Sequence, residues 1–207
     1  MTLEQRGRYT SQVNAELRKL VRKAFREAVG SFDPPFVPAP DRRVSFYREK
    51  DALYRCDAGD GMTFFLFLWM SPKGNNKFTI EGAWSEDGLF PLESNWVRST
   101  TENIDAWDPG TMSAFRCRIG EFFAPLGDHW WSIADDDERS RKLFGPLGAP
   151  DPAEFLELLS APPKSRPGQI EEAVGDAVER IRRHLLPLYD RRRAHGRSGE
   201  GSARANQ

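Results

Sequence analysis

Seven consecutive apolar residues, Phe64 to Met70, constrain the fold of this chain more than any other stretch of its sequence. The chain is otherwise polar, with a mean hydropathy of -0.63 and 29% charged residues. In a β-strand successive side chains point to opposite faces of the sheet, so an uninterrupted apolar run needs cover on both faces. The two sets are Phe65, Phe67 and Trp69 on one face and Phe64, Leu66, Leu68 and Met70 on the other. The run therefore predicts a central strand.

Further segments predict strands beside the central one. They are residues 43–49, 52–57, 77–84 and 114–122, with a short strand over 129–133. In 77–84 and 114–122 apolar and polar side chains alternate, which places Glu81, Arg116 and Arg118 on polar faces. This alternation predicts that both strands are half exposed.

Two long amphipathic helices are predicted near the ends of the sequence. An apolar stripe at helical spacing over residues 11–29 indicates the first, which Gly30 should end. A stripe over 169–186 indicates the second, and Pro187 should end it because proline lacks an N–H and clashes with the preceding turn. Short helices are predicted over 134–145 and 149–160, each opening on an aspartate cap with a glutamate three residues later.

These elements predict a single α+β domain. It consists of an antiparallel sheet of about five strands packed by two long amphipathic helices plus short helices. The domain spans residues 10–189, after a frayed N-terminus over 1–9. Residues 190–207 are polar and almost free of apolar side chains, which predicts a disordered basic tail.

Charge and cysteine content argue against several classes of protein. Lys and Arg number 30 against 31 Asp and Glu, so the chain lacks the basic excess typical of nucleic-acid binding. Two cysteines, Cys56 and Cys117, form no disulfide framework in 207 residues, and the first residues contain no apolar signal segment. The central run is far shorter than the ~20 apolar residues of a membrane span. We expect a cytoplasmic protein with reduced thiols and no membrane association.

A cluster of arginines keeps weak nucleic-acid binding open as a third hypothesis. It comprises Arg180, Arg182, Arg183, Arg191, Arg192, Arg193 and Arg197. Phosphate contacts from such a cluster would fade quickly with salt. The helix that carries the first three begins with Glu171 and Glu172, so its order of charges also complements the helix dipole. We therefore do not expect nucleic acid to be the partner.

One histidine lies in a segment suited to catalysis. His129 follows Asp128 and precedes Trp130, and a groove there would support a second hypothesis, that of an enzyme. Neighbours on a strand point to opposite faces, however, so adjacency alone does not make a dyad. The acidic run over 135–138 fits the first turn of a helix better than a calcium loop. No nucleophile, metal or phosphate-binding motif is present, so we predict no catalytic residue, metal or cofactor.

Six tryptophans support the leading hypothesis, a non-catalytic protein-interaction module. Trp96 and Trp107 fall in an irregular insertion over 86–112, where aromatic side chains are common anchors for partners. Trp130 and Trp131 cannot share one face of a strand, so one of them should be buried. The predicted binding residues are Trp69, Trp96, Trp107, Asp128, His129, Trp130 and Trp131. The expected partner is another protein or a second copy of this chain.

The placement of the two long helices decides how the second face of the central strand is covered. The polar faces of 77–84 and 114–122 suit a sheet that helices pack on one side only. We therefore expect both helices on the same face. Trp69 and the insertion tryptophans would then form a partly covered aromatic surface on the other face.

The stretch FRCRIGEFFAPLGDHWWSIADDDE, residues 115–138, resembles a bacterial domain of unknown function, the family numbered 4304. The resemblance rests on an arginine-bearing strand that runs into R-[IL]-G-E, a loop with Pro and Gly, and a W-W-x-I segment followed by acidic residues. The order of elements over about residues 11–188 is similar as well. The arginine tail and the insertion at 86–112 depart from the family pattern. The resemblance implies a single cytosolic α+β domain and brings no activity or catalytic residues.

Overall fold

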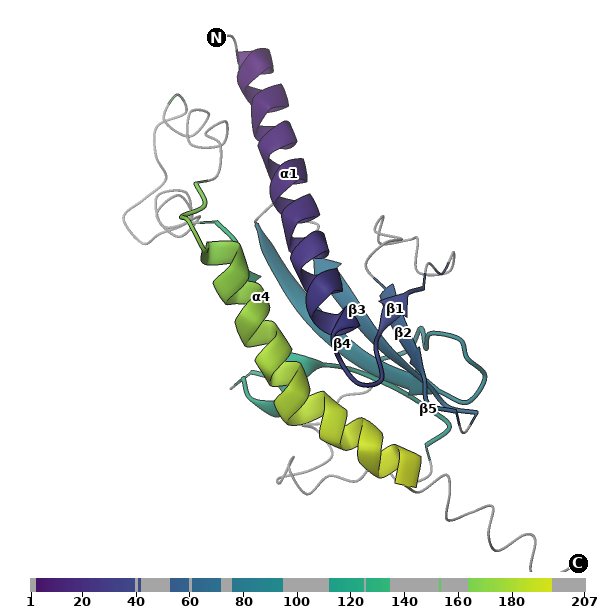
Figure 1. Cartoon of the computed structure of the whole chain (residues 1–207). Coiled ribbons are helices and arrows are strands. Elements are labelled where there is room, and N and C mark those ends of the chain that lie inside the picture. Colours follow the sequence, from purple (N-terminus) through teal and green to yellow (C-terminus); the bar gives the residue numbers. More distant parts are fainter. Residues whose placement is uncertain are drawn as a thin grey trace, which may run out of the picture.

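The computed structural model of this chain describes residues 3–39, 41, 53–59, 61–71, 76–94, 112–124, 126–134, 153 and 164–194. Figure 1 shows a sheet with two long helices across it. The strands lie in the order β1 (Val37–Pro38), β2 (Leu53–Asp57), β3 (Thr63–Met70), β4 (Lys77–Ser85) and β5 (Ala114–Arg118), all antiparallel. β6 (Trp131–Ser132) pairs with β4 beyond the end of β5. This architecture confirms the α+β class and the antiparallel sheet.

β3 occupies the centre of the sheet, as its apolar run predicts. It pairs with β2 through Leu53↔Phe67 and with β4 along its whole length. Every residue of β3 is buried except Trp69, which is half-buried. The run is therefore buried on both faces, and a different part of the chain covers each face.

Both long helices cover one face, which we call the helix face (Figure 1). α1 (Leu3–Gly30) packs Phe25 edge-on against Tyr54 of β2, with ring centroids 5.4 Å apart. The second helix consists of α4 (Gln169–Arg180), the π turn η5 (Ile181–Leu185) and a continuation to residue 194. A side chain at Gly82 of β4 would meet Leu185 at 2.7 Å, so this glycine lets the second helix lie directly on the strand. The expected placement of both helices on one face is confirmed.

Both helices are longer than the sequence predicts. α1 begins at Leu3, which corrects the prediction of a frayed N-terminus for residues 3–9; Leu, Glu, Gln and Arg at 3–6 all favour helix. The second helix runs through Pro187 to residue 194, so the predicted tail begins too early at residue 190. The π turn ends at Leu185, two residues before Pro187, and it widens the helix in the turn where the proline ring would otherwise meet a preceding carbonyl group.

Other predictions concern segments outside the described residues. They are the strand over 43–49, nearly all of the two short helices over 134–145 and 149–160, residues 95–111 of the insertion and the tail beyond residue 194. Within the described part of the chain, no helix combines the length and the apolar character needed to cross a membrane.

The polar side chains of β4 and β5 are buried, which corrects the prediction of two half-exposed strands. Glu81 on β4 is 1% exposed and Arg116 on β5 is 4% exposed. The alternation correctly places both on the face opposite the helices, which we call the second face. They are dry there because they pair with each other and because residues 86–92 cross that face. Glu81 and Arg116 on the second face of β4 and β5 are therefore buried, although the sequence alternation alone suggested contact with water.

Candidate functional site

Residues 86–92, which we call the wall segment, cover β3 on the second face. Phe90 packs against Phe65 and Phe67, with ring centroids 5.7 and 5.6 Å apart. Phe90 is 1% exposed, whereas Leu89 beside it is 49% exposed. The wall segment therefore buries Phe90 against the sheet and exposes the neighbouring Leu89 to solvent.

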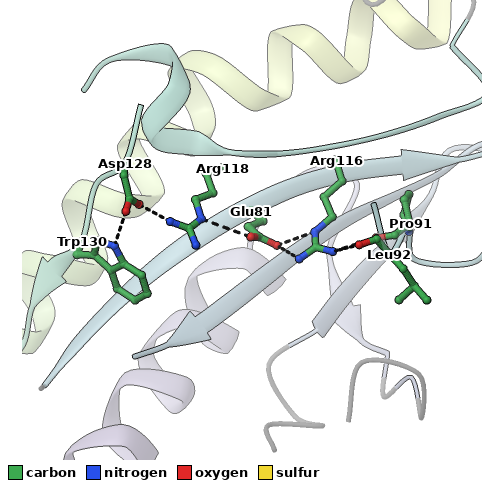
Figure 2. A network of polar contacts seen from close by, with 7 residues as sticks. All are labelled: Glu81, Pro91, Leu92, Arg116, Arg118, Asp128 and Trp130. Atoms are coloured by element: carbon green, nitrogen blue, oxygen red, sulfur yellow. Dashed lines mark hydrogen bonds and ion pairs between the residues drawn. The ribbon is translucent and has the colours of Figure 1, made fainter. Parts of the chain in front are cut away.

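A chain of charged side chains runs along the second face from the wall segment to the loop before β6 (Figure 2). Arg116 donates to the carbonyl oxygen of Leu92 at 2.7 Å and, through two nitrogens, to Oε2 of Glu81 at 2.6 and 2.8 Å. The other carboxylate oxygen of Glu81 lies 3.7 Å from Nε of Arg118, which also pairs with Asp128 at 2.6 Å. The charges balance, and the buried pair has further hydrogen bonds to satisfy it. This network fastens the wall segment and the loop before β6 to the same two strands.

Trp69 and Trp130 flank Arg118 at the more exposed end of this network. The guanidinium carbon lies 4.7 Å from the ring centroid of Trp69 and 5.5 Å from that of Trp130, and the two rings are 5.9 Å apart. The indole N–H of Trp130 donates to Asp128 at 3.0 Å. Cation–π contacts of this kind contribute roughly 0.5–1 kcal/mol when partly exposed. The structure thus brings three predicted binding residues, Trp69, Asp128 and Trp130, together around an arginine.

Trp131 and His129 lie apart from this cluster, toward the second helix. Trp131 is 5% exposed, stacks on Phe78 at 5.4 Å and donates its indole N–H to Asp176 of α4 at 2.7 Å. His129 packs edge-on against Trp131 at 4.5 Å. Burial lowers the pKa of His129, and this effect outweighs the nearby Asp176 carboxylate, which raises it. The prediction that one of the adjacent tryptophans is buried is confirmed, and the buried one is Trp131.

Asp128 and His129 therefore form no catalytic dyad. One carboxylate oxygen of Asp128 accepts a hydrogen bond from Arg118 and the other accepts one from Trp130. The imidazole packs against Trp131 and Phe123 instead. Among the residues that the structure describes, no group of three or more His, Cys, Asp or Glu side chains could hold a metal ion. The other predicted binding residues, Trp96 and Trp107, lie outside the described residues.

A groove of about 500 Å³ lies between the wall segment and the edge of the sheet formed by β1 and β2. The sheet contributes Val37, Leu53, Arg55 and Phe65, and the wall segment contributes Leu89 and Phe90. Val37 and Leu89 are each 49% exposed. Arg55 forms a long ion pair with Asp57 at 3.5 Å, and its side chain is 48% exposed. Asp41 lines the groove as well, so the groove combines an apolar floor with one carboxylate and one half-exposed cation, as in many binding sites of this size.

None of these groove residues is among the predicted binding residues. Val37 lies in a proline-rich stretch that has the composition of a connector, and its pairing with Arg55 joins separate segments of the sequence. One local signal exists: Leu89, Phe90 and Leu92 form an apolar cluster near the start of the insertion. That signal indicates a segment that packs on something, but it does not say which strands the segment leaves uncovered.

Most of the described C-terminal arginines contact other parts of the domain. Arg180 lies 4.6 Å over Phe123, Arg182 lies 5.2 Å over Phe32, Arg193 lies 5.7 Å over Phe64, and Arg192 pairs with Glu86 at 2.6 Å. Arg192 is 4% exposed, which corrects its assignment to a disordered tail. These side chains stabilise the packing of the second helix on the rest of the domain.

No protein-family model, no curated protein and no solved structure matches this chain. The resemblance of residues 115–138 to the family numbered 4304 therefore stays a prediction. What the domain does has to be inferred from its own geometry.

Proposed function

We propose that this protein is a non-catalytic protein-interaction module whose groove takes an extended segment of a partner protein. The observation that carries the proposal is the groove of about 500 Å³, with its apolar floor and the half-exposed side chains of Val37 and Leu89 in its lining. A large apolar side chain of the partner would enter the groove. The guanidinium of Arg55 can donate hydrogen bonds to main-chain carbonyl oxygens of that segment.

Exposed apolar surface outside the groove favours a protein over a small molecule as the ligand. Leu92, at the end of the wall segment, is 56% exposed and does not line the groove. A small ligand inside the groove would leave Leu92 in water, whereas a chain segment that runs along the groove and past its end would cover it. Burying apolar surface contributes roughly 25 cal/mol per Å², so the additional contact favours the longer ligand.

Two other functions have less support. An enzyme using Asp128 and His129 would need both groups at one substrate, yet the carboxylate is bound to Arg118 and Trp130 while the imidazole packs toward α4. Nucleic-acid binding would need a cluster of guanidinium groups directed at solvent; Arg182, Arg183 and Arg191 are exposed, but Arg192 is buried and paired with Glu86. The interaction module requires neither arrangement.

Selection from a random peptide library displayed on phage, with the full chain as target, tests the proposal. We expect enriched peptides to carry a large apolar residue, since such side chains dominate binding at protein interfaces. Leu89→Asp places a charge at the groove and should abolish their binding. Leu126→Asp is the matched control, because Leu126 is 90% exposed on the loop before β6 and is not part of the groove. A selection that yields no peptide, or peptides that bind both variants equally well, would refute the proposal.

A further inference from the structure

Arg192 reaches from the end of the second helix to the two ends of the insertion. Its Nε donates to the carbonyl oxygen of Met112 at 3.1 Å, and its Nη2 pairs with Oε1 of Glu86 at 2.6 Å. The backbone N–H of Glu86 in turn donates to the carbonyl oxygen of Ser113 at 3.0 Å. Residues 86 and 112 thus meet at one buried guanidinium.

The wall segment is held mainly at its ends. Arg192 binds its first residue, Glu86, and Arg116 binds the carbonyl oxygen of its last residue, Leu92. Between these ends Phe90 is the one fully buried residue of the segment. The position of Leu89 across the groove from β1 therefore depends on the packing of Phe90 and on two arginines that belong to other elements, β5 and the second helix.

We infer that Arg192 is a positioning residue for the groove: it sets the place of the wall segment and couples the groove to the C-terminal helix. The inference rests on the proposed function of the groove, because it assigns a role in that site. Arg192 touches no part of the groove itself and acts through Glu86. Displacement of residues 190–194 would free the side chain of Glu86, whose backbone N–H stays bonded to Ser113, and would widen the range of positions open to the wall segment after it.

A positioning role and a general structural role predict different patterns of hydrogen exchange when Arg192 is replaced. Loss of a structural contact in the core would raise hydrogen exchange throughout the domain, whereas loss of a positioning contact would raise it first in the wall segment. The charge-assisted bond between Arg192 and Glu86 is short, and bonds of this class are roughly twice as strong as neutral ones. Its removal should therefore be measurable without any ligand.

Hydrogen exchange of the full chain, followed by mass spectrometry, provides the first measurement. We expect Arg192→Met to raise exchange in residues 86–92 roughly tenfold and to leave residues 63–70 of β3 unchanged. Arg192→Lys keeps a positive charge near Glu86 and should have an intermediate effect. Glu86→Ala removes the same ion pair by changing its half-exposed partner, and this variant replaces Arg192→Met if the latter does not fold. Arg166→Met is the matched control, because Arg166 forms an exposed pair with Glu172 at the start of α4.

Peptides selected on the groove provide the second measurement. We expect Arg192→Met to weaken their binding by about tenfold and Arg166→Met to leave it unchanged; tenfold corresponds to about 1.4 kcal/mol. If no peptide binds the natural chain, the proposed function fails while the exchange experiment still decides the positioning role. Unchanged exchange of residues 86–92 in both Arg192→Met and Glu86→Ala would overturn the inference. An equal rise in residues 63–70 would overturn it as well.

Discussion

The phenol of Tyr189 bridges the two central strands of the sheet from the helix face. It donates to the carbonyl oxygen of Phe65 at 2.7 Å and accepts from the N–H of Ala83 at 3.1 Å. Phe65 and Ala83 are register partners on β3 and β4. Gly82 makes this approach feasible, because a Cβ atom there would lie 2.9 Å from the hydroxyl oxygen. The hydroxyl therefore helps to fasten the second helix to the sheet.

Tyr189→Phe isolates this contribution, because it keeps the ring that stacks on Phe64 at 4.5 Å and removes only the hydroxyl. A buried backbone group that loses its partner costs ~1–3 kcal/mol. Two groups are affected, and the strands can recover part of the loss by approaching each other. We expect the free energy of unfolding to fall by about 2–3 kcal/mol. With a urea m-value of about 2 kcal/mol/M, the unfolding midpoint would fall by roughly 1–1.5 M.

The same group predicts a loss of stability at alkaline pH. Burial raises the pKa of Tyr189 well above its usual value of 10.0. Above about pH 10 the unfolded chain releases this proton while the folded chain keeps it, so the stability that depends on the group falls as the pH rises. This alkaline decline should be smaller in Tyr189→Phe.

Urea unfolding followed by tryptophan fluorescence and circular dichroism measures both effects. Tyr54→Phe is the matched control: Tyr54 is equally buried, and its hydroxyl lies 3.4 Å from the carbonyl oxygen of Arg22, at the limit of a hydrogen bond. We expect a smaller loss there. A loss below ~0.5 kcal/mol in Tyr189→Phe, the range of ordinary surface substitutions, would refute the bridging role. So would a loss no larger than that of the control.

His129, Trp69 and the end of the second helix allow three more tests. Burial lowers the pKa of His129, so at acidic pH the unfolded chain binds a proton more readily than the folded chain does. The melting temperature should therefore fall as the pH drops below ~6.5, and it should fall less steeply in His129→Gln. Trp69 is half-buried, so we expect Trp69→Ala to lower the free energy of unfolding in urea by less than the ~3–5 kcal/mol typical of a fully buried large aromatic side chain. A loss in that range would show that Trp69 is an ordinary core residue. Truncation after residue 194 should change the melting temperature by less than ~4 °C, whereas truncation after residue 189 removes Arg192 and should lower it by more. Equal melting temperatures of the two truncated chains would show that Arg192 contributes no stability.

Sequence periodicity alone predicts strands β2 to β6, the two long helices and the faces to which their side chains point, but not β1 or the full length of the helices. Phe64 to Met70 can be buried only as a strand with cover on both faces, and the stripes over 11–29 and 169–186 each need a surface to pack against. The alternation in β4 and β5 also correctly indicated one helix-packed face. These predictions succeed because periodicity is a local property: it follows from the geometry of a strand or a helix.

Tertiary packing sets which polar side chains are buried and where the groove lies. Glu81 and Arg116 are 35 residues apart and Glu86 and Arg192 are 106 apart, so no local pattern identifies either partner. The groove exists because the wall segment covers β3 and stops before β1, which depends on how distant segments pack. A charge can be buried when an opposite charge and hydrogen bonds meet it in space, and periodicity records only the direction in which the side chain points.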